Sequence, residues 1–486
     1  MRKSQANLAW DTLLDIDGQP AGPLYARLAG ALRAAIRAGV LPAGSVLPPS
    51  RLLAAEMGCS RWTVTEVYQQ LVAEGYAEAR VGSGTRVVWH ADARRPDPAG
   101  PPEAATPDGI DLAPGLPDLH AFPLDRWLAA LRGASATLPY HRFGHPEPGG
   151  EPRLRRILAD YLARVRGAAA HPDDVTVCAG VTDGITRLCA ATGVRSVAVE
   201  DPGWTRLREA IAAGGVRVVP VPVDERGIRT DVLNATPDVS MVVVSPAHQF
   251  PTGVVLAPDR RAHLLNWARR VDGLIVEDDY DAEFRYDRRP LGTLQGADPG
   301  HVALAGSLSK TLSPALGLGW LVTPQRWTGP VRAVPRGAPG VLDQLGLAEF
   351  IESGGYDRHL RAARKRYRAR RDALLAALAR HLPEYRIGGV AAGLHLVLMP
   401  PDDPARRLPP ADAVRVAADA GVHIASVRQY RVDTGTPDAA LVLGYGNLAD
   451  NDVERAVSRL AAAVRPPPQV SSSTSGKLRL RRGGMT

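Results

Sequence analysis

The sequence predicts a multidomain protein with a small N-terminal α+β domain followed by a large α/β domain. Its 486 residues exceed what one compact core supports, so two or more domains are expected. Short helical patterns and a hairpin pattern fill the first 90 residues, whereas strand-like apolar runs alternate with helical stretches after residue 110. Proline and small polar residues dominate the segment between them. We therefore expect domains at 1–90 and 110–465, a flexible linker at 91–109 and a basic disordered tail at 466–486.

The composition narrows the class of protein. Hydrophobic residues make up 45% of the chain and charged residues 23%, which predicts a soluble globular protein. Three cysteines without metal-ligand spacing predict a reducing compartment and no disulfide framework. No apolar run approaches the roughly 20 residues that span a bilayer, and the first residues lack the core of a signal peptide. We therefore expect a cytoplasmic protein with no membrane partner. Half of the net charge of +8 falls in the tail, so net charge alone is weak evidence for nucleic-acid binding.

The first 90 residues predict three helices. Leu24, Leu28, Leu32 and Ile36 are spaced four apart, which is the stripe of an amphipathic helix. Farther on, Ser50 is expected to cap a short second helix.

The third helix follows at once. Ser60 is expected to cap it, and its buried side would carry Val64, Val67 and Leu71. Two short helices joined by a tight turn predict a helix-turn-helix.

The outward side of the third helix carries residue types that bond phosphates and base edges, namely Arg61, Thr63, Thr65 and Gln69. Two short strands around Gly82 and Gly84 would form a hairpin wing after it. From these residues alone, a DNA-binding domain and a small helical interaction module both remain open.

The large domain begins with six apolar runs that read as strands buried on both faces: "DVTVCAG", "SVAVED", "VRVVPVPV", "VSMVVVSP", "GLIVEDDY" and "HVALAGS". Helical stretches separate them, so a mostly parallel sheet is expected. Ligands of such sheets bind beyond the carboxyl ends of the strands.

Two of these strand ends could hold a phosphate. The first strand runs into a helix that begins at Gly180, Val181 and Thr182, whose backbone amides and helix dipole favour an anion. The last strand ends in "GSLSK", where the hydroxyls of Ser307 and Ser309 could bond phosphate oxygens.

Two other strand ends suit a flat aromatic ring. Trp204 can stack on such a ring. Asp278 could keep a pyridine nitrogen protonated, and Tyr280, on the same side of its strand, could bond a ring oxygen. Lys310 supplies an amine that can attack an aldehyde. The joint pattern predicts pyridoxal 5′-phosphate as the cofactor.

Lys310 is one of only four lysines beside 55 arginines. A surface lysine is the ordinary interpretation of any single lysine. Only an amine loses its proton near neutrality and attacks a carbonyl, so a lysine kept in a weakly polar segment favours covalent chemistry. Burial and nearby positive charge would make that amine neutral more readily.

Residues 23–88 resemble the winged helix-turn-helix of the GntR family of bacterial repressors, from "PLYARLAGALRAAIRAG" through "CSRWTVTEVYQQL" to "VGSGTRVV". The resemblance implies binding to operator DNA as a dimer on repeated half-sites. It implies that the DNA contacts are made by Arg51, Ser60, Arg61, Thr63, Thr65, Gly82 and Gly84.

The rest of the chain resembles fold-type I aminotransferases, in the variety fused behind a GntR domain that is known as MocR-type regulators. The stretches "VSPAHQFPTGVVL", "VEDDYDAEFRYDRRPLGTL" and "SLSKTLSPALGLGWLVTP" carry this resemblance. It implies an aminotransferase-like domain with a small C-terminal subdomain and a homodimer. It implies that Lys310 bonds the cofactor, that Asp278, Tyr280 and Trp204 contact its ring, and that Arg428, with Arg431 as competitor, binds an effector carboxylate.

Four positions depart from the family pattern. Gly317 stands where the family usually has an arginine that pairs with the phosphate, so a charged contact is lost. Asp183 brings a negative charge near the presumed phosphate site. Trp204 replaces the more common tyrosine. Phe250 stands where true aminotransferases have an asparagine. These changes argue against efficient turnover.

Three functions are consistent with the sequence. The first is a DNA-binding transcriptional regulator that senses an amine or amino acid through pyridoxal 5′-phosphate, and it is the one we expect. The second is an active aminotransferase with a DNA-binding arm. The third is a dimeric repressor that no longer binds the cofactor. The first implies that the large domain serves sensing rather than catalysis, although partial transamination stays open.

Overall fold

The computed structural model describes residues 10, 14–16, 18–80, 84–89, 109–136, 138–236, 238–286, 291–432 and 438–465. It divides into two compact units, residues 1–106 and 107–486. Gly82, nearly all of the linker at 91–109 and the tail at 466–486 lie outside the described residues. None of the helices in the described part of the chain is long and apolar enough to cross a membrane.

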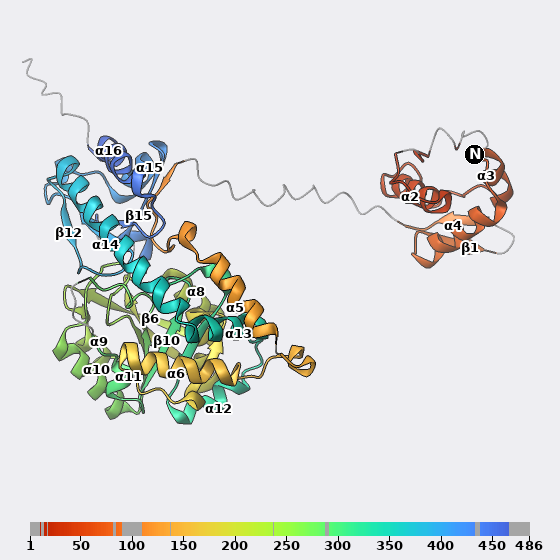
Figure 1. Ribbon diagram of the computed structural model, residues 1–486. Coiled ribbons are helices and arrows are strands. Elements are labelled where there is room, and N and C mark those ends of the chain that lie inside the picture. The colour runs from red at the N-terminus through yellow and green to blue at the C-terminus, as the bar shows by residue number, and fades with distance from the viewer. Residues whose placement is uncertain are drawn as a thin grey trace, which may run out of the picture. The chain divides into compact units, whose positions relative to one another are not determined.

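Within its described residues, the small unit contains helices α2, α3 and α4 followed by a hairpin (Figure 1). Its elements are α2 (Leu24–Arg37), α3 (Ser50–Glu56), α4 (Arg61–Ala73), β1 (Ala77–Arg80) and β2 (Gly84–Val87). The two strands pair antiparallel, with Ala77 opposite Val87. The predicted stripe on α2 is confirmed at Leu28, Leu32 and Ile36, which are buried.

Helix α4 forms as the sequence predicts. The Ser60 hydroxyl oxygen accepts the Thr63 backbone N–H at 3.1 Å and caps the helix. Val64, Val67 and Leu71 are buried. The prediction for α3 needs a correction, because Ser50 is its first helical residue and Pro49 occupies the cap position without a side-chain bond.

The large unit is built on an eight-stranded sheet with the order β4-β11-β10-β9-β8-β5-β6-β7. All six predicted strands are present in it. The strands are β4 (Val175–Cys178), β5 (Ser196–Asp201), β6 (Arg217–Asp224), β7 (Gly227–Ile228), β8 (Met241–Val244), β9 (Leu274–Asp278), β10 (Val302–Ser307) and β11 (Gly319–Val322). Neighbours from β10 through β6 run parallel, whereas β11 runs antiparallel to both of its neighbours.

Helices pack against both faces of this sheet, which buries the central strands completely (Figure 1). The helices of this part are α5 (Leu124–Ala136), α6 (Pro152–Arg166), α7 (Val181–Thr192), α8 (Thr205–Ala213), α9 (Thr230–Asn234), α10 (Pro258–Val271), α11 (Leu294–Ala297), α12 (Gln325–Ala333) and α13 (Val341–Glu352). Separate apolar clusters fill the two sides of the sheet.

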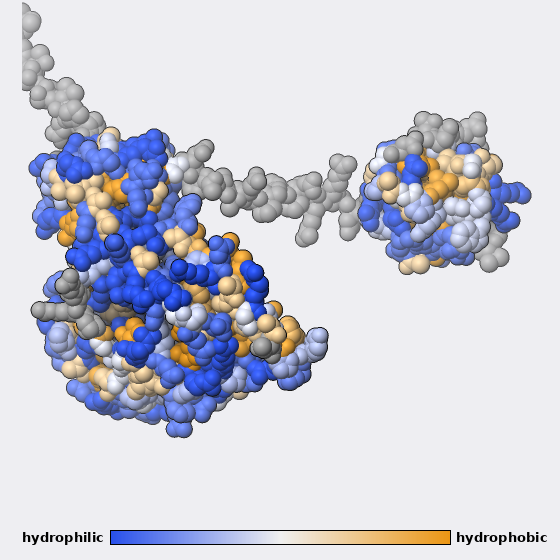
Figure 2. All heavy atoms as spheres, in the orientation of Figure 1, coloured by the Kyte–Doolittle hydropathy of each residue, from blue (hydrophilic) through white to orange (hydrophobic). Residues whose placement is uncertain are grey.

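A smaller C-terminal subdomain follows the long helix α14 (Gly355–His381), which runs along the large sheet toward α16 (Figure 1). Its four-stranded sheet has the order β12-β13-β16-β15. Its elements are β12 (Arg386–Gly388), β13 (His395–Met399), α15 (Pro410–Asp419), β14 (Val422–His423), β15 (Ala425–Ser426), β16 (Leu441–Gly444) and α16 (Val453–Val464), with β14 pairing β3 (Ile110–Asp111). Hydrophobic side chains gather in scattered patches on the face shown in Figure 2.

Candidate functional site

A cavity of about 490 Å³ lies where the carboxyl ends of the sheet strands meet the C-terminal subdomain. It is bordered by the ends of β4, β5, β9 and β10, the edge where a parallel sheet binds ligands. The structure brings together around this cavity the nine residues expected to bind the cofactor: Gly180, Val181, Thr182, Trp204, Asp278, Tyr280, Ser307, Ser309 and Lys310.

Lys310 follows β10 directly and points into the cavity. Its Nζ donates a hydrogen bond to the Gly115 carbonyl oxygen and lies 5.5 Å from the centre of the Trp204 ring. Burial lowers the pKa of Lys310 below its usual value; Asp281 and Asp278 oppose this shift, and the guanidinium of Arg206 adds to it. Such an amine loses its proton more easily than the amine of a surface lysine. Loss of the proton is required before an amine can act as a nucleophile.

Asp278 ends β9 at the floor of the cavity. Its Oδ1 atom is buried and has no hydrogen-bond partner within the described chain. Burial raises the pKa of Asp278 to about 7; Asp279 and Asp281 raise it further, while Lys310 lowers it. A buried carboxylate oxygen without a partner is costly. The arrangement fits a protonated pyridine nitrogen placed against this oxygen.

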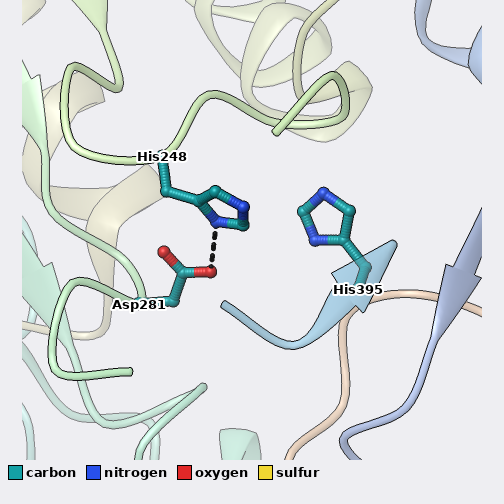
Figure 3. Close-up of side chains that lie close together, drawn as sticks. All are labelled: His248, Asp281 and His395. Carbon is teal, nitrogen blue, oxygen red and sulfur yellow. Dashed lines mark hydrogen bonds and ion pairs between the residues drawn. The ribbon is translucent and has the colours of Figure 1, made fainter. Parts of the chain in front are cut away.

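Tyr280 lines the cavity and contacts a cluster formed by His248, Asp281 and His395. Figure 3 shows these three side chains, with His248 paired to Asp281. The Tyr280 hydroxyl lies 3.1 Å from Nδ1 of His248, and the same Nδ1 lies 2.8 Å from Oδ2 of Asp281. The His395 ring stands beside His248 with centroids 4.9 Å apart, and its Nε2 donates to the Pro251 carbonyl at 3.1 Å. Burial lowers the pKa of His395 well below its usual value, and His248 lowers it further.

His248, Asp281 and His395 have the residue types and the spacing of a metal site. Two of their ring nitrogens are already engaged, because His248 Nδ1 pairs with Asp281 and His395 Nε2 bonds a carbonyl. The geometry is explained without an ion: the histidine–carboxylate pair fixes the position of the Tyr280 hydroxyl at the cavity wall.

The end of the cavity where a phosphate is expected lies at the start of α7. Gly180 precedes the helix with a φ of 130°, a backbone conformation that favours glycine, and the first helical residues Val181 and Thr182 line the cavity. The negative charge expected from Asp183 is neutralised within the protein. Its carboxylate accepts from Arg187 Nε at 2.9 Å and from the Ala179 backbone N–H at 3.0 Å, and Arg336 lies 3.4 Å away.

Gly317, which stands where the family usually has a phosphate-binding arginine, does not line the cavity. A glycine also offers no side chain that could take over the contact. The φ of Gly317 is 54°, a left-handed conformation that glycine adopts without strain. One guanidinium does line the cavity among the described residues, and it belongs to Arg206 on α8.

The two arginines expected to bind an effector lie on or beside the short helical turn Val427–Tyr430. This segment packs next to Trp204, because Gly203 N–H donates to the Tyr430 carbonyl at 3.0 Å. Arg428 is exposed on it, and Arg431 bonds Asp438 at 2.8 Å. Neither residue lines the cavity.

Sequence reasoning missed Arg206, His248, Asp281 and His395 as cavity or cavity-wall residues. Arg206 had a signal, since it stands two residues after Trp204 at the same strand end. Asp281 had the same kind of signal, since it follows Tyr280 directly. The two histidines had none, because only the fold brings their segments together with Asp281. Phe250, recognised as a departure, packs edge-to-face against Trp204 with centroids 5.5 Å apart.

The expected DNA-binding residues lie on α3, α4 and the hairpin. Arg51 and Arg61 are exposed, and Arg61 Nε lies 3.3 Å from the Ser50 hydroxyl. Thr63 and Thr65 are partly buried on α4. Gly84 opens β2 with a φ of 81°, which favours glycine at this turn. The structure places these residues in one small unit, as a DNA-contacting surface requires.

The comparisons with known proteins match both units. A family model for bacterial regulatory proteins of the gntR family matches residues 24–87, and one for aminotransferase class I and II matches residues 107–460. The HTH-type pyridoxine biosynthesis transcriptional regulator PdxR of Corynebacterium glutamicum is 32% identical over 89% of this chain and 94% of its own length. The probable rhizopine catabolism regulatory protein MocR of Rhizobium meliloti is 31% identical over 93% of this chain and 96% of its own length. The chain belongs to the MocR/PdxR-type transcriptional regulators.

Solved structures show the fold of the regulator's large unit. An archaeal alanine:glyoxylate aminotransferase is 23% identical with a TM-score of 0.66, covering 73% of this chain and 90% of that chain. Kynurenine aminotransferase of Pyrococcus horikoshii gives the same identity and TM-score over 74% and 91%. The expected combination of a GntR winged helix-turn-helix with a fold-type I aminotransferase domain is therefore confirmed.

An ion pair behind the cavity holds the strand end that carries Asp278 in this regulator. Arg166, at the end of α6, donates to Asp279 through Nε at 2.6 Å and Nη2 at 2.9 Å, and both side chains are buried. Asp279 faces away from the cavity, as strand alternation predicts.

Replacing Arg166 with methionine leaves Asp279 buried without its partner. We expect the Arg166→Met variant to lose about 3–5 kcal/mol of unfolding free energy, measured by urea denaturation. The control is Arg164→Met on the same helix, whose exposed pair with Asp357 is worth about 1 kcal/mol or less. Equal losses in the two variants would contradict the role given to the buried pair.

A second buried carboxyl, Glu200, lies beneath Trp204. Its Oε2 accepts from the Ser245 backbone N–H at 3.2 Å and from Gln249 Nε2 at 3.3 Å. Burial raises the pKa of Glu200 to about 8, opposed by its hydrogen bonds to Gln249 and Ser245 and increased by Asp278. The folded regulator therefore holds this proton more tightly than the unfolded chain does.

A raised folded pKa means that the contribution of Glu200 to stability is present at low pH and is lost as the pH rises toward about 8. We expect Glu200→Gln, which needs no proton, to gain stability relative to the wild type between about pH 5 and pH 8. Thermal midpoints across this range measure the gain. The exposed Glu209→Gln variant is the control, and a difference that stays constant with pH would refute the assignment.

Proposed function

We propose that this regulator binds pyridoxal 5′-phosphate in the cavity, with Lys310 as the residue that bonds it, and senses an amine or amino acid there. The aminotransferase fold implies the cofactor, and its exact placement is our proposal. One observation carries the placement. The buried Asp278 Oδ1 atom, which has no partner in the described chain, lines the same cavity as an amine with a lowered pKa.

The chain supplies a contact for each part of the cofactor. The first amides of α7 and the hydroxyls of Ser307 and Ser309 would bind the phosphate. Asp278 would hold a proton on the ring nitrogen, and Tyr280 would bond the ring oxygen, held in place by His248. Trp204 would stack on the ring face. When bound, the cofactor supplies an aldehyde that an amine can bond covalently.

An effector amine would compete with Lys310 for that aldehyde and so release the lysine side chain. The regulator responds only if this exchange favours one arrangement of the protein over another, because tight binding alone shifts no equilibrium. Arg206 lines the cavity and is suited to an effector carboxylate. Arg428 and Arg431 are the other candidates, and each would have to turn toward the cavity.

We further propose that the regulator is a homodimer that acts in the cytoplasm on operator DNA. Apolar side chains stay exposed on one face of the large unit, at Leu124 and Leu128 of α5 and Leu342 of α13. Such a patch favours association. Light scattering of the full chain tests the dimer.

The cofactor assignment predicts a visible absorption band in the purified protein supplied with pyridoxal 5′-phosphate. We expect Lys310→Ala to lose the band of the lysine-bound cofactor, whereas Lys365→Ala retains it. Absorption spectra of the three proteins at equal concentration measure this. A band of equal strength in Lys310→Ala would contradict the assignment, and no band in any protein would support a dimeric repressor without cofactor.

The carboxylate assignment is tested with L-alanine and ethylamine, which differ in the carboxylate group. We expect Arg206→Ala to raise the dissociation constant for L-alanine about tenfold to a hundredfold, the range for a hydrogen bond to a charged group, and to leave ethylamine binding unchanged. Spectral titration of the cofactor-loaded protein gives both constants. Arg428→Ala and Arg431→Ala are measured alongside. If one of them, and not Arg206→Ala, weakens the binding of L-alanine but not of ethylamine, the carboxylate contact belongs to that arginine instead.

A further inference from the structure

Trp62 is the second residue of α4 and the most exposed tryptophan in the described part of the chain, with 70% of its surface accessible. Large aromatic side chains contribute most when they are buried against a partner. Exposure alone does not make a single apolar side chain functional, so the role of Trp62 depends on where it lies on the helix-turn-helix.

The helix geometry places Trp62 on the outermost side of α4. Each residue advances about 100° around the axis, so Trp62 lies about 200° from Val64, which points into the core. Gln69, almost two turns later, returns to nearly the same side as Trp62. This side faces away from the other helices of the small unit.

The polar side chains of the first turn are bonded locally. Thr63 N–H donates to the Ser60 hydroxyl, and the Thr65 hydroxyl donates to the Arg61 carbonyl at 2.9 Å. Arg61 Nε reaches the Ser50 hydroxyl on α3. The indole of Trp62 is thus the largest exposed apolar group at the start of the helix, and Arg51 on α3 and Arg61 on α4 are also exposed.

The start of the second helix of a helix-turn-helix enters the major groove and contacts base edges. Thymine presents a C5 methyl group beside the acceptor O4, a combination that no other base shows there. An indole offers the matching pair, an apolar edge and one N–H donor without an acceptor. The exposed Arg51 and Arg61 of the same helix-turn-helix suit the DNA backbone better than they suit an apolar protein partner.

We propose that Trp62 selects thymine at one position of the operator, with its apolar edge against the methyl group and Nε1–H donating to O4. The inference rests on DNA binding by the GntR-type domain and is independent of the cofactor. It adds a specificity-determining residue to the DNA contacts expected at Arg61 and Thr63.

The test uses the full-length protein and a library of random-sequence duplexes. Selection with the wild type yields a binding motif, and each thymine of that motif is then replaced in turn by deoxyuridine, which removes only the methyl group. Dissociation constants are measured at low salt, where phosphate contacts keep weak variants measurable. The proteins are the wild type, Trp62→Ala, Trp62→Phe and the control Tyr25→Ala, which removes an exposed aromatic side chain from α2.

We expect one deoxyuridine position to weaken wild-type binding about fourfold, the value of one buried methyl group. The same position should have no effect on Trp62→Ala, while Trp62→Phe and Tyr25→Ala keep the wild-type dependence. The inference is overturned if Trp62→Ala shows the wild-type losses at every position, or if it binds the motif as tightly as the wild type. A wild type that enriches no motif would refute sequence-specific DNA binding itself, a result that leaves the absorption test of the cofactor untouched.

Discussion

The large unit is organised around the carboxyl group of Asp278, whose Oδ1 atom has no hydrogen-bond partner among the described residues. The Oδ1 atom of Asp278 is buried at the end of a central strand, and leaving a charged oxygen unbonded there costs more than about 1–3 kcal/mol. Parallel strands bring their carboxyl ends to one edge, so the same edge also carries Lys310, Trp204 and the start of α7. The unsatisfied oxygen thus lowers the stability of the protein without ligand, and a ligand with a positively charged ring nitrogen would remove this destabilisation on binding.

Arginine side chains compensate two other carboxylates near the cavity. Asp279, next to Asp278, forms a buried ion pair with Arg166. This pair compensates the negative charge of Asp279, so two adjacent aspartates can be buried at the end of β9. Asp183, at the end where a phosphate is expected, is neutralised by Arg187 and Arg336. These pairs leave the helix dipole of α7 available to a phosphate. They also explain how an acidic residue at the third position of α7 is compatible with an anion site.

The sequence predicts those parts of the site whose residues lie together in one short segment after a strand. Asp278 and Tyr280 line the cavity and Asp279 does not, as expected, although β9 already ends at Asp278. The capping role of Ser60 followed from its local sequence. The cluster of His248, Asp281 and His395 could not be read this way, because its members meet only after the C-terminal subdomain packs on the sheet. Asp183 has two arginine partners: Arg187, four residues along α7, was within reach of sequence reasoning, whereas Arg336 lies 153 residues away and was not. Ser50 was misjudged as a cap because Pro49, with no side-chain donor or acceptor, takes that position.

The central claim is that Lys310, and no other lysine, forms a covalent bond with pyridoxal 5′-phosphate in this cavity. The most direct measurement is borohydride reduction of the cofactor-loaded protein, followed by proteolysis and mass spectrometry of the peptides. The account predicts that the phosphopyridoxyl group is found on the peptide containing Lys310 and is absent from the peptides containing Lys3, Lys365 and Lys477. An unmodified Lys310 peptide, or the group on one of the other three lysines, would contradict it.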